Sequence, residues 1–241
     1  MRKIGLISVI ALLLGWMSVH TSIAADSDSR PGYKVLENPH PTANPDKIEM
    51  LEFFAYTCGH CYNFETGYLS KWTPPDDVEF IKIPLAFGSG LQYMIRGYYT
   101  ADAMGIGPEF QKAIFRAFKK ERKRFNSVES VADFATQFGV SKKDFLGTYN
   151  SFAVEVKVNT GEQLAKEYGI HGVPTVIING KYQTSGAIAN GFKDAMEKID
   201  MLIKKERALM NASAKDDGVE ADVDRNSKTD KTEQTKITED K

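Results

Sequence analysis

Cys58 and Cys61 are the only cysteines of the 241-residue chain, and they stand in the motif Cys58-Gly59-His60-Cys61 at the end of an apolar run. A strand that ends in this motif and leads into a helix places Cys58 at the helix N-terminus, where free N–H groups and the helix dipole stabilise a thiolate. Cys61 follows one turn later, close enough to form a disulfide. The spacing predicts redox chemistry on the thiols of other proteins.

Two other interpretations of the cysteine pair are a purely structural disulfide and half of a zinc site. A disulfide across so short a loop adds little stability. Zinc needs about four nitrogen or sulfur ligands, and the chain beyond residue 24 adds only His40, His60 and His171 to the cysteines. Redox chemistry is therefore favoured, with Cys58 as the exposed attacking sulfur and Cys61 as the buried sulfur that resolves mixed disulfides. No metal and no cofactor are expected.

Two further residues near the motif carry predictions. The imidazole of His60 can donate a hydrogen bond to the Cys58 thiolate, and its protonated form would stabilise that charge. The alternative is an ordinary surface histidine. Glu52 lies within the buried apolar run. Because burial of an unpaired carboxylate is costly, Glu52 needs a partner, an unusual pKa, or a side chain that reaches solvent.

The elements around these residues read as strand, helix, strand, a helical block, then two strands and a last helix. The expected bounds are a strand over 48–56, a helix over 59–70, a strand over 78–84, a helical block over 88–159, a helix segment over 160–168, a strand over 174–178, a hairpin turn at 179–180, its partner strand over 181–184 and an amphipathic helix from 188. Helix starts of the capping-box kind are expected at Asn126 with Glu129 and at Ser141 with Asp144. The aromatic residues at helical spacing are expected in the core: Tyr98, Tyr99, Phe134 and Phe138.

The two ends of the chain differ from this pattern. Residues 1–24 combine Arg2 and Lys3 with an apolar stretch and small residues before Ala24, which predicts a cleaved signal peptide. The stretch is shorter than the ~20 residues that a membrane anchor needs. Removing it takes away two positive charges and changes the formal net charge from −1 to −3, which argues against nucleic acid as a partner. Residues 211–241 are rich in charge and lack aromatic residues, so a disordered charged tail is expected.

The motifs resemble those of the DsbA family of periplasmic disulfide oxidases, roughly over residues 30–210. The resemblance rests on Glu52-Phe53-Phe54-x-x-x-Cys58-x-His60-Cys61-Tyr62-x-Phe64-Glu65 and on Gly172-Val173-Pro174-Thr175-Val176-Ile177-Ile178-Asn179-Gly180. It implies an α/β protein, a thioredoxin fold with an inserted helical domain. The implied parts are a signal peptide over 1–24, the first part of the thioredoxin-like domain over 25–87, the inserted helical domain over 88–159, the second part over 160–210 and the charged tail over 211–241.

The resemblance also implies roles for individual residues. Pro174 would be a cis proline that faces the active-site disulfide, with the backbone of Val173 free to pair with an extended substrate chain. Glu52 would lie beneath the active site near Cys61, with Lys82 as its partner.

The implied function is a thiol:disulfide interchange protein that donates its Cys58–Cys61 disulfide to exported, folding proteins in the periplasm. A DsbB-like membrane oxidase would reoxidise it, and a monomer is expected. One departure from the family is the dipeptide Gly59-His60, where the best-known members carry Pro-His and where protein disulfide isomerase, a milder oxidant, carries Gly-His. A disulfide isomerase or reductase, and a non-enzymatic thioredoxin-fold binding protein, therefore remain alternatives.

Overall fold

The computed structural model describes residues 31–87 and 91–233, with side chains as far as residue 213. The predicted signal peptide over 1–24 lies outside the described residues. Of the helices in the described ranges, none combines the length and the apolar character that crossing a membrane requires.

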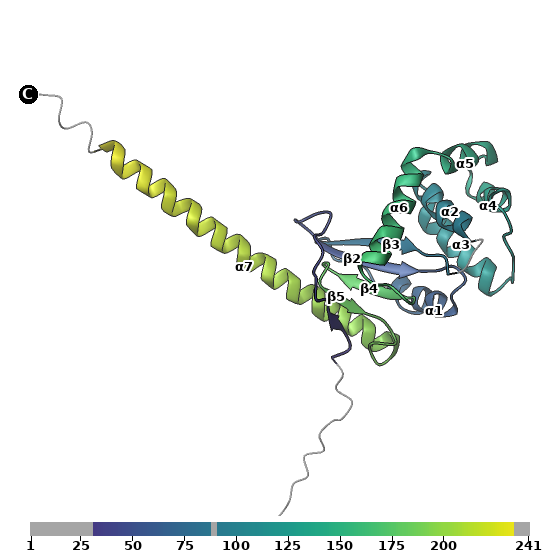
Figure 1. Cartoon of the computed structure of the whole chain (residues 1–241), viewed down its shortest axis with the longest axis horizontal. Helices are drawn as coiled ribbons and strands as arrows, with labels where there is room; N and C mark the ends of the chain where they lie inside the picture. Colours follow the sequence, from purple (N-terminus) through teal and green to yellow (C-terminus); the bar gives the residue numbers. More distant parts are fainter. Residues whose placement is uncertain (1–30, 88–90, 234–241) are drawn as a thin grey trace, which may run out of the picture.

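The described residues form one mixed sheet with the strand order β1-β5-β4-β2-β3 (Figure 1). Its strands are β1 (Lys34–Val35), β2 (Ile48–Phe54), β3 (Val78–Pro84), β4 (Thr175–Ile178) and β5 (Tyr182–Thr184). β2 and β3 are parallel, whereas every other neighbouring pair is antiparallel. In the register of the parallel pair, Glu52 lies opposite Lys82. The sheet therefore brings the two predicted charged partners next to each other.

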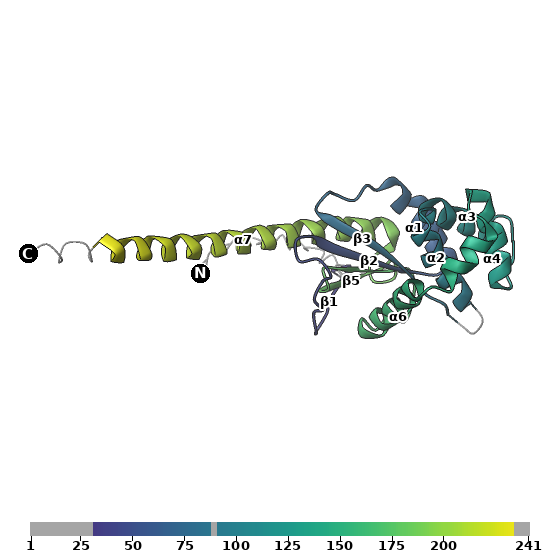
Figure 2. The same ribbon diagram turned by 90° about the horizontal axis from the view of Figure 1, so that it is seen from above.

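Helices cover both faces of the sheet and one end of it. They are α1 (Gly59–Gly67), the 3-10 turn η1 (Leu69–Lys71), α2 (Gln92–Ala103), α3 (Gly107–Lys119), α4 (Val128–Ala135), the 3-10 turn η2 (Thr136–Phe138), α5 (Lys142–Tyr149), α6 (Phe152–Glu167) and α7 (Gly191–Glu233). Figure 2 shows α7 along one face of the sheet and α6 across the other. α2 to α5 gather at the end to which β2 and β3 point (Figure 1).

The alternation of side chains along β2 explains the two layers. Ile48 and Met50 point to one face, where they pack with residues of α1 and α7. Leu51 and Phe53 point to the other face and pack with the C-terminal part of α6. Because both faces are covered, β2 is buried throughout, as its nearly continuous apolar sequence predicts.

The helical block shares a core with the active-site region. Phe54 and Cys61 belong to the same buried cluster as Phe110, Ile114 and Phe115 of α3. The four aromatic residues expected in the core lie in this cluster or the smaller one beside it. Cys61 is thus held at the junction between the sheet domain and the helical block.

One predicted capping box and one predicted domain boundary need adjustment. The first capping box begins one residue later than predicted, because Ser127 caps α4 and exchanges hydrogen bonds with Ser130. The predicted helix start at Ser141 is confirmed, since Ser141 accepts from the Asp144 N–H, but the Asp144 carboxylate accepts from the Ser141 hydroxyl and not from its backbone N–H. α6 runs unbroken through residues 152–167, so the predicted boundary at 159 falls inside a helix that leaves the helical block and packs on the sheet.

The structure also differs from the expectation of disorder after residue 211. α7 continues as one helix to Glu233 and extends beyond the domain (Figure 1). Its sequence from Asn211 to Glu233 contains no proline and only one glycine, so nothing in it forbids a helical backbone. High charge and low hydrophobicity predict that this segment does not form a packed core, but they do not determine its local backbone conformation. Residues 234–241 lie outside the described residues.

Candidate active site

Cys58 occupies the N-cap position of α1, after a three-residue connection from the end of β2. Its Sγ accepts a hydrogen bond from the Cys61 N–H at 3.2 Å, which satisfies one of the free donors of the first turn. As a thiol, the same sulfur donates to the Val173 carbonyl at 3.5 Å. Cys58 is half-buried, so part of the residue is still accessible to solvent.

Cys61 is completely buried, and its pKa is shifted in the opposite direction to that of Cys58. Both cysteines are free thiols in the structure. The pKa of Cys58 is lowered to about 6, mainly by the hydrogen bond from the Cys61 side chain. The backbone N–H groups of Cys61 and His60 and the charge of His60 lower it further, whereas burial acts in the opposite direction. The same hydrogen bond, followed by burial, raises the pKa of Cys61. The pair is therefore one reactive thiolate and one protected thiol.

This asymmetry predicts how the stability of the two redox forms depends on pH. The folded-state pKa of Cys58 lies below the ~8.5 of an unfolded cysteine. Its stabilising contribution to the reduced form is therefore fully present above about pH 8.5 and is lost as pH falls through about 6. From pH 5 to pH 8 the free energy of unfolding of the reduced form should rise by on the order of 2 kcal/mol relative to that of the oxidised form. This figure allows for solvent screening at the partly exposed Cys58.

Thermal melts of both redox forms at several pH values would test this. The melting temperature of the reduced form, minus that of the oxidised form, should rise by roughly 5 °C from pH 5 to pH 8. The loop entropy of the disulfide sets a constant offset between the forms and does not change with pH. A difference that stays flat across this range would show that Cys58 has no stabilised thiolate.

His60 lies on the exposed side of the motif. Its ring faces the ring of Phe192 with 6.3 Å between the centroids. Its charge and its backbone N–H both lower the pKa of Cys58, although they rank below the contribution of Cys61. The hydrogen bond to Cys58 from residue 60 comes from its backbone N–H, while the ring contributes through its charge.

A buried charge network lies beneath the cysteines. Glu52 is 1% exposed, and burial raises its pKa to about 8 against the opposing effect of Lys82. The Lys82 Nζ lies 3.9 Å from Glu52 Oε2 and 2.6 Å from Glu65 Oε2. Glu52 is therefore mostly protonated at neutral pH, and the ion pair of Lys82 is with Glu65. The contact between Glu52 and Lys82 is present, but it is the weaker of the two.

Glu65 and Gln111 complete this network, and neither was assigned a role from the sequence, although Glu65 stands in the motif that carries the family resemblance. Glu65 follows Cys61 at a spacing of i, i+4 on α1, so helical periodicity could have shown that both lie on one face. Gln111 is buried on α3, and its Oε1 accepts from Lys82 at 3.4 Å. It comes from the helical block, and no local pattern links it to β3.

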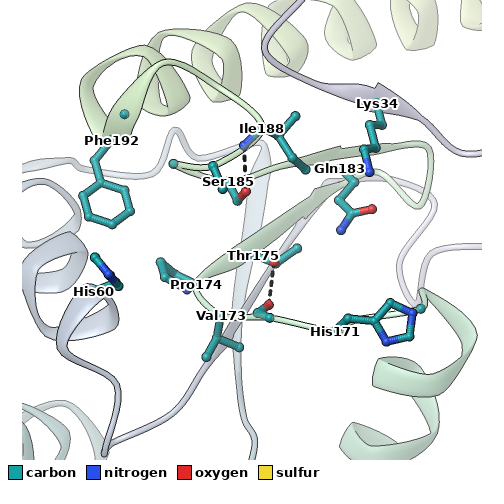
Figure 3. A pocket seen from close by; sticks show the side chains of 15 residues that line it. Lys34, His60, His171, Val173, Pro174, Thr175, Gln183, Ser185, Ile188 and Phe192 are labelled. Carbon is teal, nitrogen blue, oxygen red and sulfur yellow. Dashed lines mark hydrogen bonds between the residues drawn. The ribbon is translucent and has the colours of Figure 1, made fainter.

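Val173 and Pro174 lie beside Cys58, and the peptide bond between them is cis. No described residue accepts a hydrogen bond from the Val173 N–H, and proline has no N–H to donate. The two residues border a cleft of about 610 Å³ between β5, the start of α7 and the segment before β4. Figure 3 shows His60 and Phe192 at one end of this cleft and Lys34 and His171 at the other.

The described residues contain no group of three or more His, Cys, Asp and Glu side chains arranged to hold a metal ion. The site thus consists of two cysteines at a helix N-terminus, a histidine between them, a proline segment and a cleft. These features define a thiol–disulfide oxidoreductase built on a thioredoxin-like fold.

Comparison with known proteins gives the family. A family model of the DSBA-like thioredoxin domain matches residues 49–197. The chain is 36% identical over 204 residues to the thiol:disulfide interchange protein DsbA of Pseudomonas aeruginosa, covering 83% of this chain and 96% of the relative. It is 38% identical over 208 residues to DsbA of Pseudomonas syringae pv. tomato, covering 86% and 96%. The chain therefore belongs to the DsbA family.

Solved structures agree. The crystal structure of Pseudomonas aeruginosa DsbA superposes with a TM-score of 0.68 at 38% identity, over 75% of this chain and 94% of that one. That of the oxidoreductase DsbA from Xylella fastidiosa superposes with a TM-score of 0.67 at 30% identity, over 73% and 96%. The predicted fold class and the predicted activity of a thiol–disulfide oxidoreductase are confirmed. The isomerase, reductase and non-enzymatic alternatives are not favoured.

Proposed function

We propose that this chain, in its oxidised form, donates the Cys58–Cys61 disulfide to reduced proteins that have been exported to the periplasm. The observation that carries the proposal is the inequality of the two sulfurs. Cys58 is half-buried with a pKa of about 6, whereas Cys61 is fully buried with a raised pKa. A substrate thiolate can reach Cys58, and Cys58 is the better leaving group.

The exchange proceeds in two steps. A substrate thiolate attacks Cys58 Sγ, the Cys58–Cys61 bond breaks, and Cys61 leaves with the electron pair. A second substrate thiol loses its proton and attacks the substrate sulfur of the mixed disulfide, and Cys58 leaves as a thiolate. The substrate gains a disulfide and the protein gains two electrons.

Cys61 needs a proton when it leaves, because its raised pKa makes the buried thiolate unfavourable. Glu52 lies close enough for its charge to raise the pKa of Cys61. With its own pKa at about 8, Glu52 is protonated at neutral pH. We assign Glu52 as the proton donor to Cys61. Lys82, held by Glu65, is the positive charge that limits how far the pKa of Glu52 rises.

Val173 and Pro174 supply the substrate-binding backbone. The free N–H of Val173 can pair with an extended chain that lies along the segment before β4, as an added strand would. Pro174 offers no competing N–H beside the sulfurs. The adjoining cleft, with Ile188 and Phe192 on its wall, is suited to apolar side chains that follow the substrate cysteine.

Reoxidation requires a partner, because donation leaves the protein with two extra electrons. A DsbB-like membrane oxidase is the partner that the family suggests. An oxidising compartment such as the periplasm is consistent with a cysteine pair used as the oxidised form. The predicted signal peptide over residues 1–24 would deliver the chain there.

The reduction potential, measured by equilibration with glutathione, tests the proposal. We expect a value clearly above the roughly −270 mV of thioredoxin and near the roughly −180 mV of protein disulfide isomerase, in keeping with the pKa of Cys58. The His60→Ala variant should lower the potential by about 30 mV, a tenfold change in the equilibrium constant. A potential at or below that of thioredoxin would instead favour a reductase.

A further inference from the structure

A basic segment, Lys119–Arg124, lies directly beside the active-site motif. It comprises the last residue of α3 and the start of the connection to α4, with five basic residues and one acidic residue. Lys119 Nζ donates to the carbonyl of Thr57, the residue before Cys58, at 3.1 Å. A Cβ at Gly59 would lie 3.3 Å from the same nitrogen. The missing side chain at residue 59 thus leaves room for Lys119, and Figure 2 shows α3 beside α1.

The positive charge of the basic segment is not neutralised locally. Among the described residues none forms an ion pair with any of its five cations, and its one acidic residue, Glu121, pairs with Arg116 at 3.1 Å. Residues 120–124 are all exposed. Two cations are held over aromatic rings, Lys120 at 5.8 Å from Tyr62 and Lys123 at 4.7 Å from Phe134. The chain as a whole has a net charge of −1, so this concentration of positive charge is local.

One residue of the basic segment has an unfavourable backbone conformation. Arg122 has a φ of 51°, in the left-handed region that glycine adopts with less strain. The hydrogen bond from the Lys123 N–H to the Ala117 carbonyl, at 2.9 Å, closes the turn around it. Arg122 therefore holds a cation at a position where glycine would be less strained.

We propose that the basic segment is a docking surface for acidic stretches of the reduced polypeptides that Cys58 oxidises. The inference rests on the proposed function and adds to it the class of preferred substrate: chains with Asp or Glu a few residues from a cysteine. Opposite charges raise the rate of encounter, and the effect weakens as salt screens them. The contact of Lys119 with Thr57 places this attraction next to the sulfur that is attacked.

Two reduced peptides of one sequence would test this. Each carries two cysteines, flanked by glutamates in the first and by glutamines in the second. At low ionic strength the full-length oxidised protein should oxidise the glutamate peptide about tenfold faster, and the ratio should approach one as salt is added.

The variant Lys120→Gln/Arg122→Gly/Arg124→Gln should bring the ratio of the two rates close to one at low salt. The Arg122→Gly change relieves the backbone strain at the left-handed residue. An unchanged or higher melting temperature would therefore show that unfolding does not cause the loss of the peptide preference. A control, Lys71→Gln/Lys143→Gln/Lys204→Gln, removes the same charge from exposed sites on η1, α5 and α7 and should keep the preference.

Equal rates for the two peptides in the native protein would overturn the docking surface while leaving the oxidase function intact. If the control variant also loses the preference for the glutamate peptide, net charge explains that preference, and the docking surface is overturned. Binding of phosphatidylglycerol vesicles through the segment, without any peptide preference, would show a membrane-facing role instead. If neither peptide is oxidised, the proposed function fails and the inference fails with it.

Discussion

The Cys58→Ser variant is expected to leave a reduced test protein at the uncatalysed rate of oxidation, whereas Cys61→Ser should trap the substrate on Cys58. The reason lies in exposure and acidity. Cys58 is half-buried with a pKa of about 6, and Cys61 is fully buried. A substrate thiol reaches only Cys58, and Cys61 is the only thiol within the protein that is placed to displace a bound substrate from Cys58.

The experiment loads glutathione onto the single remaining cysteine of each variant and then adds the reduced substrate. The substrate carries a single cysteine, so in Cys61→Ser its thiolate displaces glutathione from Cys58 and forms a mixed disulfide that neither Cys61 nor a second substrate thiol can resolve. Non-reducing gels and mass spectrometry of the adduct read out the result. The same treatment of Cys58→Ser should give little adduct. An adduct through Cys61 but none through Cys58 would reverse the two roles.

Strands β2 to β5 and the active-site motif could be predicted from the sequence because their signals are local, whereas the two-residue β1 was not expected. The second strand of the parallel pair has the predicted bounds, since an apolar run between a proline pair and a loop defines it. The position of Cys58 at a helix start follows from a motif placed at the end of a buried strand. Periodicity and turn residues carry this information without any tertiary contact.

The residues that modify the site come from elsewhere in the chain and could not be predicted in the same way. Gln111 and Lys119 both belong to α3, which is amphipathic in sequence. Its pattern shows which face is buried, but it does not show which residues of β3 or α1 that face meets. The preference of Lys82 for Glu65 over Glu52 is likewise a result of packing, because it depends on distances of 2.6 and 3.9 Å between three elements.

Glu52→Gln is expected to stabilise the protein, and the gain should grow with pH. Burial raises the pKa of Glu52 to about 8, well above the value of an unfolded glutamate, near 4.3. Below about pH 4 the carboxyl is neutral in both the folded and the unfolded chain, and it costs nothing. As pH rises towards 8, the unfolded chain ionises while the folded chain keeps its proton, so the free energy of unfolding falls. Glutamine cannot ionise and is spared this loss.

The gain in the free energy of unfolding should be small at pH 4 and on the order of 3 kcal/mol at pH 8, which is roughly 5 to 10 °C in melting temperature. Lys82 keeps its ion pair with Glu65 in the variant, so no buried charge is left without a partner. Glu109→Gln, the same change at an exposed residue of α3, is the matched control and should shift stability by less than about 0.5 kcal/mol. Denaturant unfolding of the reduced proteins at pH 4, 6 and 8 would measure these differences. A gain that is equal at all three values would mean that the buried carboxyl does not titrate in this range, and the assignment of Glu52 as a proton donor to Cys61 would then lose its basis.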